Sequence, residues 1–167
     1  MFGFEPAAPA TLARRQRLLD KGVSDVVLLG LTVKPDRKVR MDLAARGVDL
    51  LEYVPDNGWL ARVHANREAS PLPGLFCVQP LTPSVRVQTG LDTLASRQDN
   101  VPVYVHAVPD RPAAGIAATL ATAGFESLAP VLVGSRAHLA GTIPAHRFPD
   151  FLRLASAHRD VQRVEAG

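Results

Sequence analysis

Residues 48–63 read VDLLEYVPDNGWLARV and place a turn signal between two apolar stretches. The turn residues Asp56-Asn57-Gly58 are typical of a tight β-turn, so the stretch predicts a hairpin. Alternation along its first strand is expected to place Leu51 and Tyr53 opposite Val48, Leu50 and Val54. Both faces of the strand would then be apolar. Because an antiparallel sheet in water needs only one apolar face, something must cover the other.

The sequence on either side of this hairpin indicates a repeat. PDRKVRMDLAARGV begins at Pro35 and PAAGIAATLATAGF begins at Pro112, a constant offset of 77 residues (112 − 35 = 77). Each copy has proline near a first helical turn, apolar residues four apart and glycine just past the end, which are helix start and stop signals. The runs before them, DVVLLGLTV (25–33) and VPVYVHAV (101–108), are rich in β-branched residues and predict strands.

The second copy continues with its own hairpin, ESLAPVLVGSRAHLAGTIP, which turns near Gly134-Ser135-Arg136. Its loop is longer, so Leu60 is expected to match Leu139 at an offset of 79 residues (139 − 60 = 79). A helix over 144–158 and a strand reading DVQRVEA follow. In the first copy this helix shrinks to NREASPLPG, ahead of the strand LFCVQPL.

Each copy therefore reads β-α-β-β-α-β, and the predicted fold class is α+β with two tandem ferredoxin-like modules and antiparallel sheets. The first module is expected to have a reduced second helix. The predicted organisation is an N-terminal helical lead-in, a first module, a linker and a second module, over residues 1–23, 24–82, 83–100 and 101–167. Modules of this size bury only about 60% of their unfolded surface, so each gains from packing on something else.

The first strand of each module predicts which face carries the helices. Val26 and Leu28 are expected on one face, with Val27, Leu29 and Leu31 on the other. By the repeat match, Val103 and Val105 correspond to the first set, and Tyr104, His106 and Val108 to the second. The spare face is then apolar in the first module and amphipathic in the second. The two sheets are expected to pack on one another, or at least one is expected to dock a partner protein, and the two arrangements are compatible. Burying 400 Å² of apolar surface corresponds to roughly 10 kcal/mol.

Composition narrows the possible functions. The net charge of +3 comes from scattered arginines, and Arg14, Arg15 and Arg17 indicate a solvated helix face rather than a nucleic-acid footprint. The single cysteine, Cys77, excludes an internal disulfide and is expected to be buried. No apolar run reaches membrane-spanning length. The five histidines are dispersed, so neither a metal nor a cofactor is expected, and Ser135 beside His138 indicates turn chemistry rather than a nucleophile pair.

The combination of a strand, a helix ending AARGV and the hairpin LLEYVPDNGWLARV resembles the N-terminal propeptide region of bacterial subtilisin-like serine proteases. In that family a hairpin of the form Y-[IV]-P-[DH]-N-[AG]-aromatic-L recurs. The strand LFCVQPLTPSVRV is similar to the V-x-x-V-x-P segment that follows it. The second copy, ending FLRLASAHRDVQRVEA, also resembles such a propeptide, so the resemblance covers about residues 25–167.

This resemblance implies a module that inhibits a protease domain, assists its folding, or does both. In such families the sheet packs on two helices of the protease, and the segment after the last strand lies along the substrate cleft. The partner-binding residues implied for this chain are Tyr53, Trp59, Ala61, Tyr104, His106, Val164, Glu165, Ala166 and Gly167. The sequence contains no recognisable Asp-His-Ser catalytic set, so we expect that the protein is not an enzyme. Its expected partner is a subtilisin-like catalytic domain, in the same chain or a separate one, and neither nucleic acid nor a membrane.

Three other functions stay open. One is a stand-alone adaptor that reuses the propeptide fold. Another is a sensor that binds a small molecule between paired modules, for which His106 and Arg62 are the polar candidates. RNA binding by an open sheet is the third, with Tyr104 as its one aromatic in either first strand. A precursor fragment would be secreted or periplasmic, whereas a complete chain would be cytoplasmic.

Overall fold

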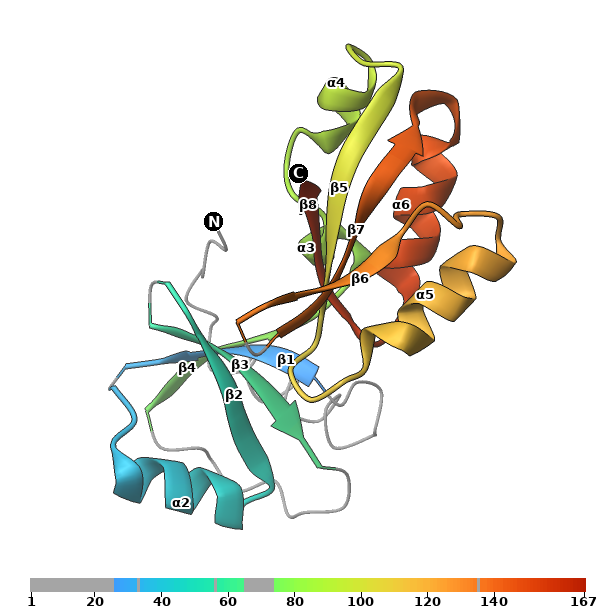
Figure 1. The fold of residues 1–167 in the computed structure, drawn as a ribbon. Coiled ribbons are helices and arrows are strands. Elements are labelled where there is room, and N and C mark those ends of the chain that lie inside the picture. Colours follow the sequence, from blue (N-terminus) through green and yellow to red (C-terminus); the bar gives the residue numbers. More distant parts are fainter. Residues whose placement is uncertain (1–25, 33, 56, 65–73, 135) are drawn as a thin grey trace. The chain divides into compact units, whose positions relative to one another are not determined.

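The computed structural model describes residues 26–32, 34–55, 57–64, 74–134 and 136–167. The chain divides into two compact units, Met1–Leu81 and Thr82–Gly167. Each has a four-stranded antiparallel sheet and few helices, so the fold is α+β (Figure 1). The predicted lead-in over 1–23 and the predicted second helix of the first module lie outside the described residues.

The first unit is a sheet with one described helix. Its elements in chain order are β1 (Val26–Leu31), α2 (Arg37–Ala45), β2 (Val48–Val54), β3 (Gly58–Val63) and β4 (Leu75–Pro80). The strand order across the sheet is β2-β3-β1-β4. Helix α2 begins because Asp36, its N-cap, accepts a hydrogen bond from the Val39 N–H at 2.8 Å. Its end lies at Gly47, whose φ of 77° is a conformation that glycine adopts readily.

The second unit repeats this arrangement with a second helix in place. Its elements are α3 (Pro83–Arg86), α4 (Leu91–Ala95), β5 (Asn100–Ala107), α5 (Ala113–Thr122), β6 (Ala129–Val133), β7 (Arg136–Pro144), the 3₁₀ helix η1 (Ala145–Arg147), α6 (Phe148–Ala157) and β8 (Val161–Ala166). The strand order is β6-β7-β5-β8. A single parallel bridge joins Val87 to Val164 on the outer side of β8. The helix predicted over 144–158 is confirmed, with Pro149 in the first turn of α6.

Each unit has its own apolar core between its sheet and its helices. In the first, Leu43 of α2 packs on Val27, Leu29 and Trp59. In the second, Ile116 and Leu120 of α5 and Phe148 and Phe151 of α6 pack on alternate residues of β5. The equivalence of Leu43 and Leu120, predicted from the repeat, is consistent with this, since both are fully buried at the same helical position.

The linker predicted over 83–100 is instead part of the second unit. Helices α3 and α4 lie within this stretch, and Leu91 of α4 is 2% exposed in the second core. Arg86 of α3 is also buried, and its guanidinium donates a hydrogen bond to the Ser156 carbonyl at 3.2 Å near the end of α6. The stretch predicted as a linker therefore packs on the second unit through Leu91 and Arg86.

The structure corrects the predicted strand match by one residue. Leu29 pairs with Trp59 in the first sheet, and Val105 pairs with Leu139 in the second. The strand offset is therefore 76 residues (105 − 29 = 76), and Trp59 rather than Leu60 is equivalent to Leu139. Because a slip of one residue exchanges the two faces of a strand, Val103 and Val105 correspond to Val27 and Leu29, not to Val26 and Leu28.

A β-bulge also corrects the prediction for the hairpin of the first unit. The register between β2 and β3 shifts between Leu50 and Glu52, so that Leu50 opposes Ala61 while Tyr53 opposes Trp59. Leu50 and Tyr53 therefore share a face, whereas simple alternation had placed them on opposite faces.

Candidate protein-binding surface

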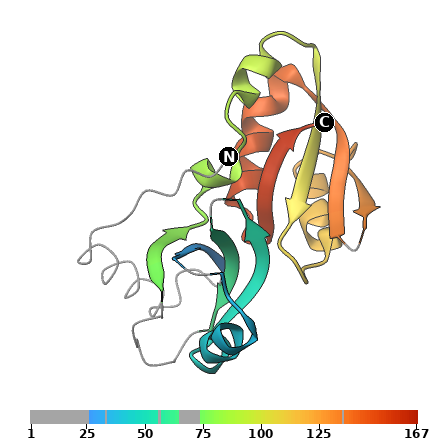
Figure 2. The ribbon, with the colours of Figure 1, turned by 90° about the vertical axis from the view of Figure 1, so that its left-hand side faces the viewer.

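The sheet of the second unit has one face packed on α5 and α6 and an opposite face that we call the open face (Figure 2). Along β5, Val101, Val103 and Val105 are buried in the core, while Pro102 and Tyr104 between them are exposed. This alternation with period two is what a strand with one buried face requires. It places Tyr104 and His106 on the open face, where the sequence had suggested partner-binding residues.

A polar network lies on this face. The His106 imidazole Nε2 lies 2.8 Å from Oε1 of Glu165, and the other carboxylate oxygen lies 3.2 Å from Nε of Arg163. Glu165 is thus held between two basic side chains on neighbouring strands. The His138 ring from β7 packs edge-on against His106, with ring centroids 4.5 Å apart. These contacts restrict the side-chain rotamers at the middle of the open face.

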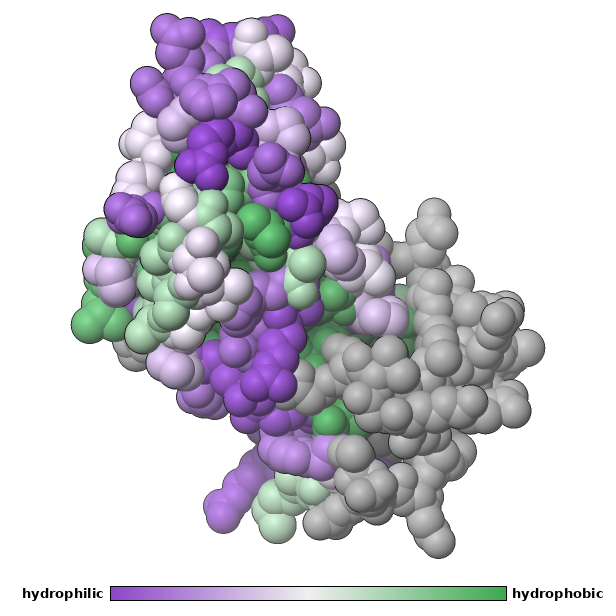
Figure 3. All heavy atoms as spheres, turned by 90° about the vertical axis from the view of Figure 1, so that its right-hand side faces the viewer, coloured by the Kyte–Doolittle hydropathy of each residue, from purple (hydrophilic) through white to green (hydrophobic). Residues whose placement is uncertain are grey.

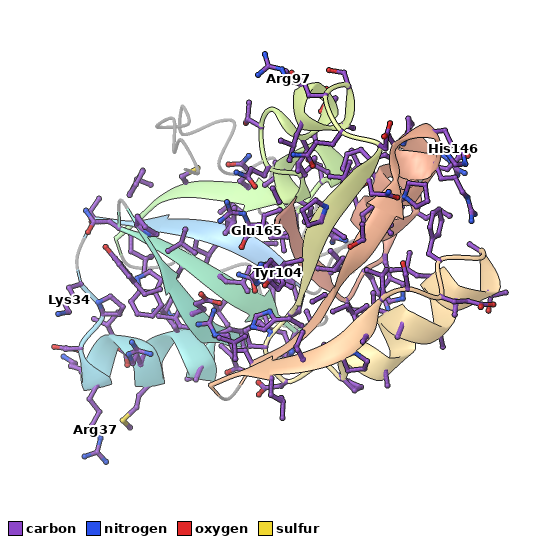
Figure 4. All side chains as sticks on the ribbon, turned by 45° about the horizontal axis from the view of Figure 1, so that its top comes forward. Lys34, Arg37, Arg97, Tyr104, His146 and Glu165 are labelled. Atoms are coloured by element: carbon purple, nitrogen blue, oxygen red, sulfur yellow. The ribbon has the colours of Figure 1, made fainter. Side chains whose placement is uncertain are left out.

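Tyr104 lies beside the network and faces solvent. It is directly opposite Glu165 in the β5–β8 pairing, and the two side chains lie next to each other in Figure 4. Its side chain is 38% exposed, as is that of Val131 on β6, which lies opposite His138. The face therefore combines an aromatic residue and a branched aliphatic residue with a hydrogen-bonded charged centre. Of these residue types, tyrosine and arginine are enriched in protein interfaces.

The four C-terminal candidate residues do not form an extended tail. Val164 is fully buried in the core of the second unit, so its side chain offers no surface to a partner. Glu165 is on the open face. Ala166 pairs with Val103, and the Gly167 N–H donates to the Pro102 carbonyl at 3.0 Å. Glu165 alone of these four therefore has a side chain placed for docking.

The three candidates from the first unit lie on the face of its sheet that α2 covers. Trp59 is 8% exposed and Ala61 is fully buried, both in the core beneath α2, so their assignment to a docking surface is wrong. The indole of Trp59 is flanked by the Arg40 guanidinium at 4.6 Å and by the Tyr53 ring at 5.4 Å. Tyr53, which is 55% exposed, is therefore the edge of this core cluster and not part of the opposite face.

The opposite face of the first sheet is also apolar, as the hairpin sequence suggested. Val26, Leu28, Leu60 and Cys77 are each at most 2% exposed, yet none belongs to the core cluster under α2. The Phe76 ring covers Gly30, where a Cβ atom would lie only 2.6 Å from the ring. Both faces of the first sheet therefore carry apolar side chains, and the side chains named here are buried on each face.

Sequence reasoning missed two residues of the network, His138 and Arg163. The alternation of side chains along a strand could have shown which face of its own strand each of these two residues occupies. It could not show that they lie beside His106, because this depends on the pairing of β5 with β7 and β8, which are distant from β5 in the sequence. Ser135, considered with His138, lies outside the described residues, and Cys77 is buried. No group of three His, Cys, Asp or Glu side chains that could hold a metal ion occurs within the described ranges.

Comparison with known proteins adds one finding. A family model described as "Domain of unknown function (DUF8729)" matches residues 3–83, which span the first unit almost completely. No curated protein and no solved structure matches the chain. Among the described helices, none is long and apolar enough to cross a membrane.

Proposed function

We propose that the chain is a non-catalytic protein-binding protein whose two units are ferredoxin-like and resemble the propeptides of subtilisin-like proteases. The strand orders β2-β3-β1-β4 and β6-β7-β5-β8, with the β-α-β-β-α-β element order of the second unit, support the ferredoxin-like assignment. The proposed partner is a subtilisin-like catalytic domain, in the same chain or a separate one.

The observation that carries this proposal is the open face of the second unit. Its centre holds Tyr104 beside a His106–Glu165–Arg163 network, and none of these side chains is part of the core. Side chains already held by intramolecular bonds lose little conformational entropy when a partner docks, which favours binding. The face of a four-stranded sheet is also a surface that two partner helices can cover.

A surface of this kind supports two related activities. By binding a near-native state of the protease more tightly than its unfolded chain, the sheet would shift the folding equilibrium by the difference in affinity. If residues after β8 enter the substrate cleft, the same docking would inhibit the enzyme. An adaptor that reuses this fold would use the same face with another protein partner, so the choice of partner distinguishes the two readings.

Binding measured against a panel of catalytically inactive subtilisin-like domains tests the proposal. Tyr104→Ala is expected to weaken binding by about 2 kcal/mol, since central interface tyrosines commonly contribute this much. Tyr53→Ala is the matched control, because Tyr53 is more exposed but lies on the α2 side of the other sheet. Failure of every domain in the panel to bind, or equal losses in the two variants, would contradict the proposal.

A further inference from the structure

Residues 86–88, which read RVQ, lie along the outer edge of β8, and we call them the brace. Val87 forms a parallel bridge with Val164 and packs against the core of the second unit. Helix α3, which leads into the brace, contacts both β8 and α6 (Figure 1). Because β8 is terminal in the order β6-β7-β5-β8, the brace covers the edge of the strand that carries Glu165.

The two hydrogen bonds of Gln88 lie on either side of Glu165. The Gln88 backbone N–H donates to the Val164 carbonyl at 2.9 Å, and its side-chain Oε1 accepts from the Ala166 N–H at 3.0 Å. Neighbouring residues of a strand direct their backbone groups to opposite edges. The groups of Val164 and Ala166 therefore point to the brace, and those of Glu165 point to β5. Gln88 thus bonds the outward backbone groups that flank the central carboxylate of the open face.

The side chain of Gln88 takes the place of a backbone carbonyl in this contact. In a regular parallel pair, a residue bonds the two residues that flank its partner through its own N–H and its own C=O. Gln88 makes the first of these bonds with its N–H and the second with its side-chain oxygen. An aliphatic side chain of similar size cannot accept the second bond. Position 88 therefore requires an acceptor oxygen and not only a side chain of suitable size.

Arg86 fixes the brace to the chain that leads into β8. Its buried guanidinium donates hydrogen bonds to the Ser156 carbonyl at 3.2 Å and to the His158 carbonyl. Both acceptors precede the start of β8 at Val161. Hydrogen bonds from a charged donor are stronger than those between neutral groups. The brace therefore holds the chain just before β8 through Arg86 and the last residues of β8 through Gln88.

We propose that Gln88 is a positioning residue of the open face, because it holds the backbone on both sides of Glu165. The carboxylate of Glu165 lies 2.8 Å from His106 Nε2 and 3.2 Å from Arg163 Nε. Its side chain also lies beside that of Tyr104 (Figure 4). Side-chain hydrogen bonds need distances of about 2.7–3.2 Å, so a small shift of β8 relative to β5 breaks the contact with His106. The effect on docking rests on the proposed function, whereas the placement of the carboxylate does not.

Side-chain NMR of His106 in the full chain tests this placement without any partner. Gln88→Leu removes the acceptor and keeps a similar size, so the His106 imidazole signals are expected to move toward those of the Glu165→Gln variant. Exchange of the Ala166 amide hydrogen should become about 10-fold faster, since one hydrogen bond is lost. Gln88→Glu keeps an acceptor oxygen and should retain the wild-type signals.

Two controls separate positioning from a general loss of structure. Ser84→Ala removes a 3.0 Å hydrogen bond with Thr82, which lies just before the brace and does not reach β8, and should leave the His106 signals unchanged. Helix α5 is the internal reference, because it packs on the other face of the sheet. Its sequence AAGIAATLAT contains no ionisable residue, and pale green and white spheres gather over it in Figure 3. Its amide signals should stay unchanged in every variant.

Binding to the panel of inactive protease domains tests the effect on docking separately. Gln88→Leu is expected to weaken binding about 10-fold, and Gln88→Glu to preserve it. Unchanged His106 signals or unchanged binding in Gln88→Leu would overturn the positioning role. So would an equal change in Ser84→Ala, shifts that extend through α5, or no recovery in Gln88→Glu. If the His106 signals change as expected but no domain binds the wild-type chain, the proposed function fails and the positioning role stands.

Discussion

At the scale of single residues, Trp59 shows how a motif residue can serve the core and not a partner. Its ring is buried among Arg40, Tyr53 and the core side chains of the first sheet. Large aromatic residues of the core contribute several kcal/mol through transfer from water and the cavity that their removal leaves. Placement in the core therefore predicts a loss of stability on substitution and no specific loss of docking.

The Trp59→Ala variant should lower the free energy of unfolding of the first unit by about 3–5 kcal/mol. Tyr53→Ala removes the exposed neighbour of the same cluster and should cost about 1 kcal/mol. Urea unfolding followed by circular dichroism measures both. An unchanged unfolding midpoint for Trp59→Ala would show that the indole is not in the core.

Glu165 tests the network of the open face at the same scale. Glu165→Gln removes the charge from the bonds with both His106 and Arg163, so a loss of about 1 kcal/mol in stability is expected. The loss is small because the three side chains are each about a quarter to a third exposed. Arg153→Gln, whose exposed pair with Asp150 is on α6, is the control and should change almost nothing. Equal effects in the two variants would mean that the network is an ordinary surface ion pair.

At the scale of elements, the helices α2, α5 and α6 could be predicted from the sequence, whereas α3 and α4 lie in the predicted linker and the strand faces of the first unit could not be predicted. The match between α2 and α5 depends on local signals, such as the start near proline, the apolar spacing and the final glycine, so the offset of 77 holds at Leu43 and Leu120. The connection between strand and helix is one residue longer in the second unit, which changes the offset of the first strand to 76. No local pattern marks that insertion, yet it exchanges every side chain between the two faces.

The bulge at Leu51 is a second feature without a local signal. It places Leu50 and Tyr53 on the same face although their spacing suggests opposite faces. The candidate site depended on these assignments. Tyr104, His106 and Glu165 lie on the open face as the sequence suggested, whereas Trp59, Ala61 and Val164 lie in cores. His138 and Arg163 were missed because they reach the network through the pairing of their strands with β5, which joins distant parts of the sequence.

Two glycines give a paired prediction for the elements of the second unit. A Cβ at Gly141 of β7 would clash with the Ser127 carbonyl oxygen, a backbone atom that cannot move easily. Gly141→Ala should therefore destabilise the unit by about 1–3 kcal/mol. A Cβ at Gly115 of α5 would meet no atom within 4 Å, so Gly115→Ala should stabilise the unit by about 0.5–1 kcal/mol. Denaturant midpoints should move in opposite directions, and a shift of the same sign would contradict the packing described for β7.

At the scale of the whole molecule, the two units have separate cores, one beneath α2 and one beneath α5 and α6. The family model matches residues 3–83, almost the same range as the first unit, while the second unit carries the open face. The two halves of the repeat therefore share an arrangement and differ in their surfaces. The apolar residues of both faces are buried in the first unit, and the second presents a polar and aromatic face.

Separate cores predict separate effects of equivalent substitutions. Leu43→Ala and Leu120→Ala remove the same side chain from the same helical position in the two units, and each should cost about 2–5 kcal/mol. Hydrogen exchange followed by mass spectrometry should show lost protection in β1–β4 for the first variant and in β5–β8 for the second. Uniform loss across the chain in both variants would indicate a single cooperative core.

We propose above that the open face of the second unit docks a subtilisin-like catalytic domain. Amide NMR of the labelled chain, titrated with catalytically inactive domains of this class, tests it most directly. Docking predicts shifted or broadened signals at Tyr104, His106 and Glu165, and at Ala140 of β7, which pairs with Tyr104. The signals of α5 should be unchanged. Unperturbed spectra with every domain in the panel, or perturbations confined to α5 and the first unit, would contradict the claim.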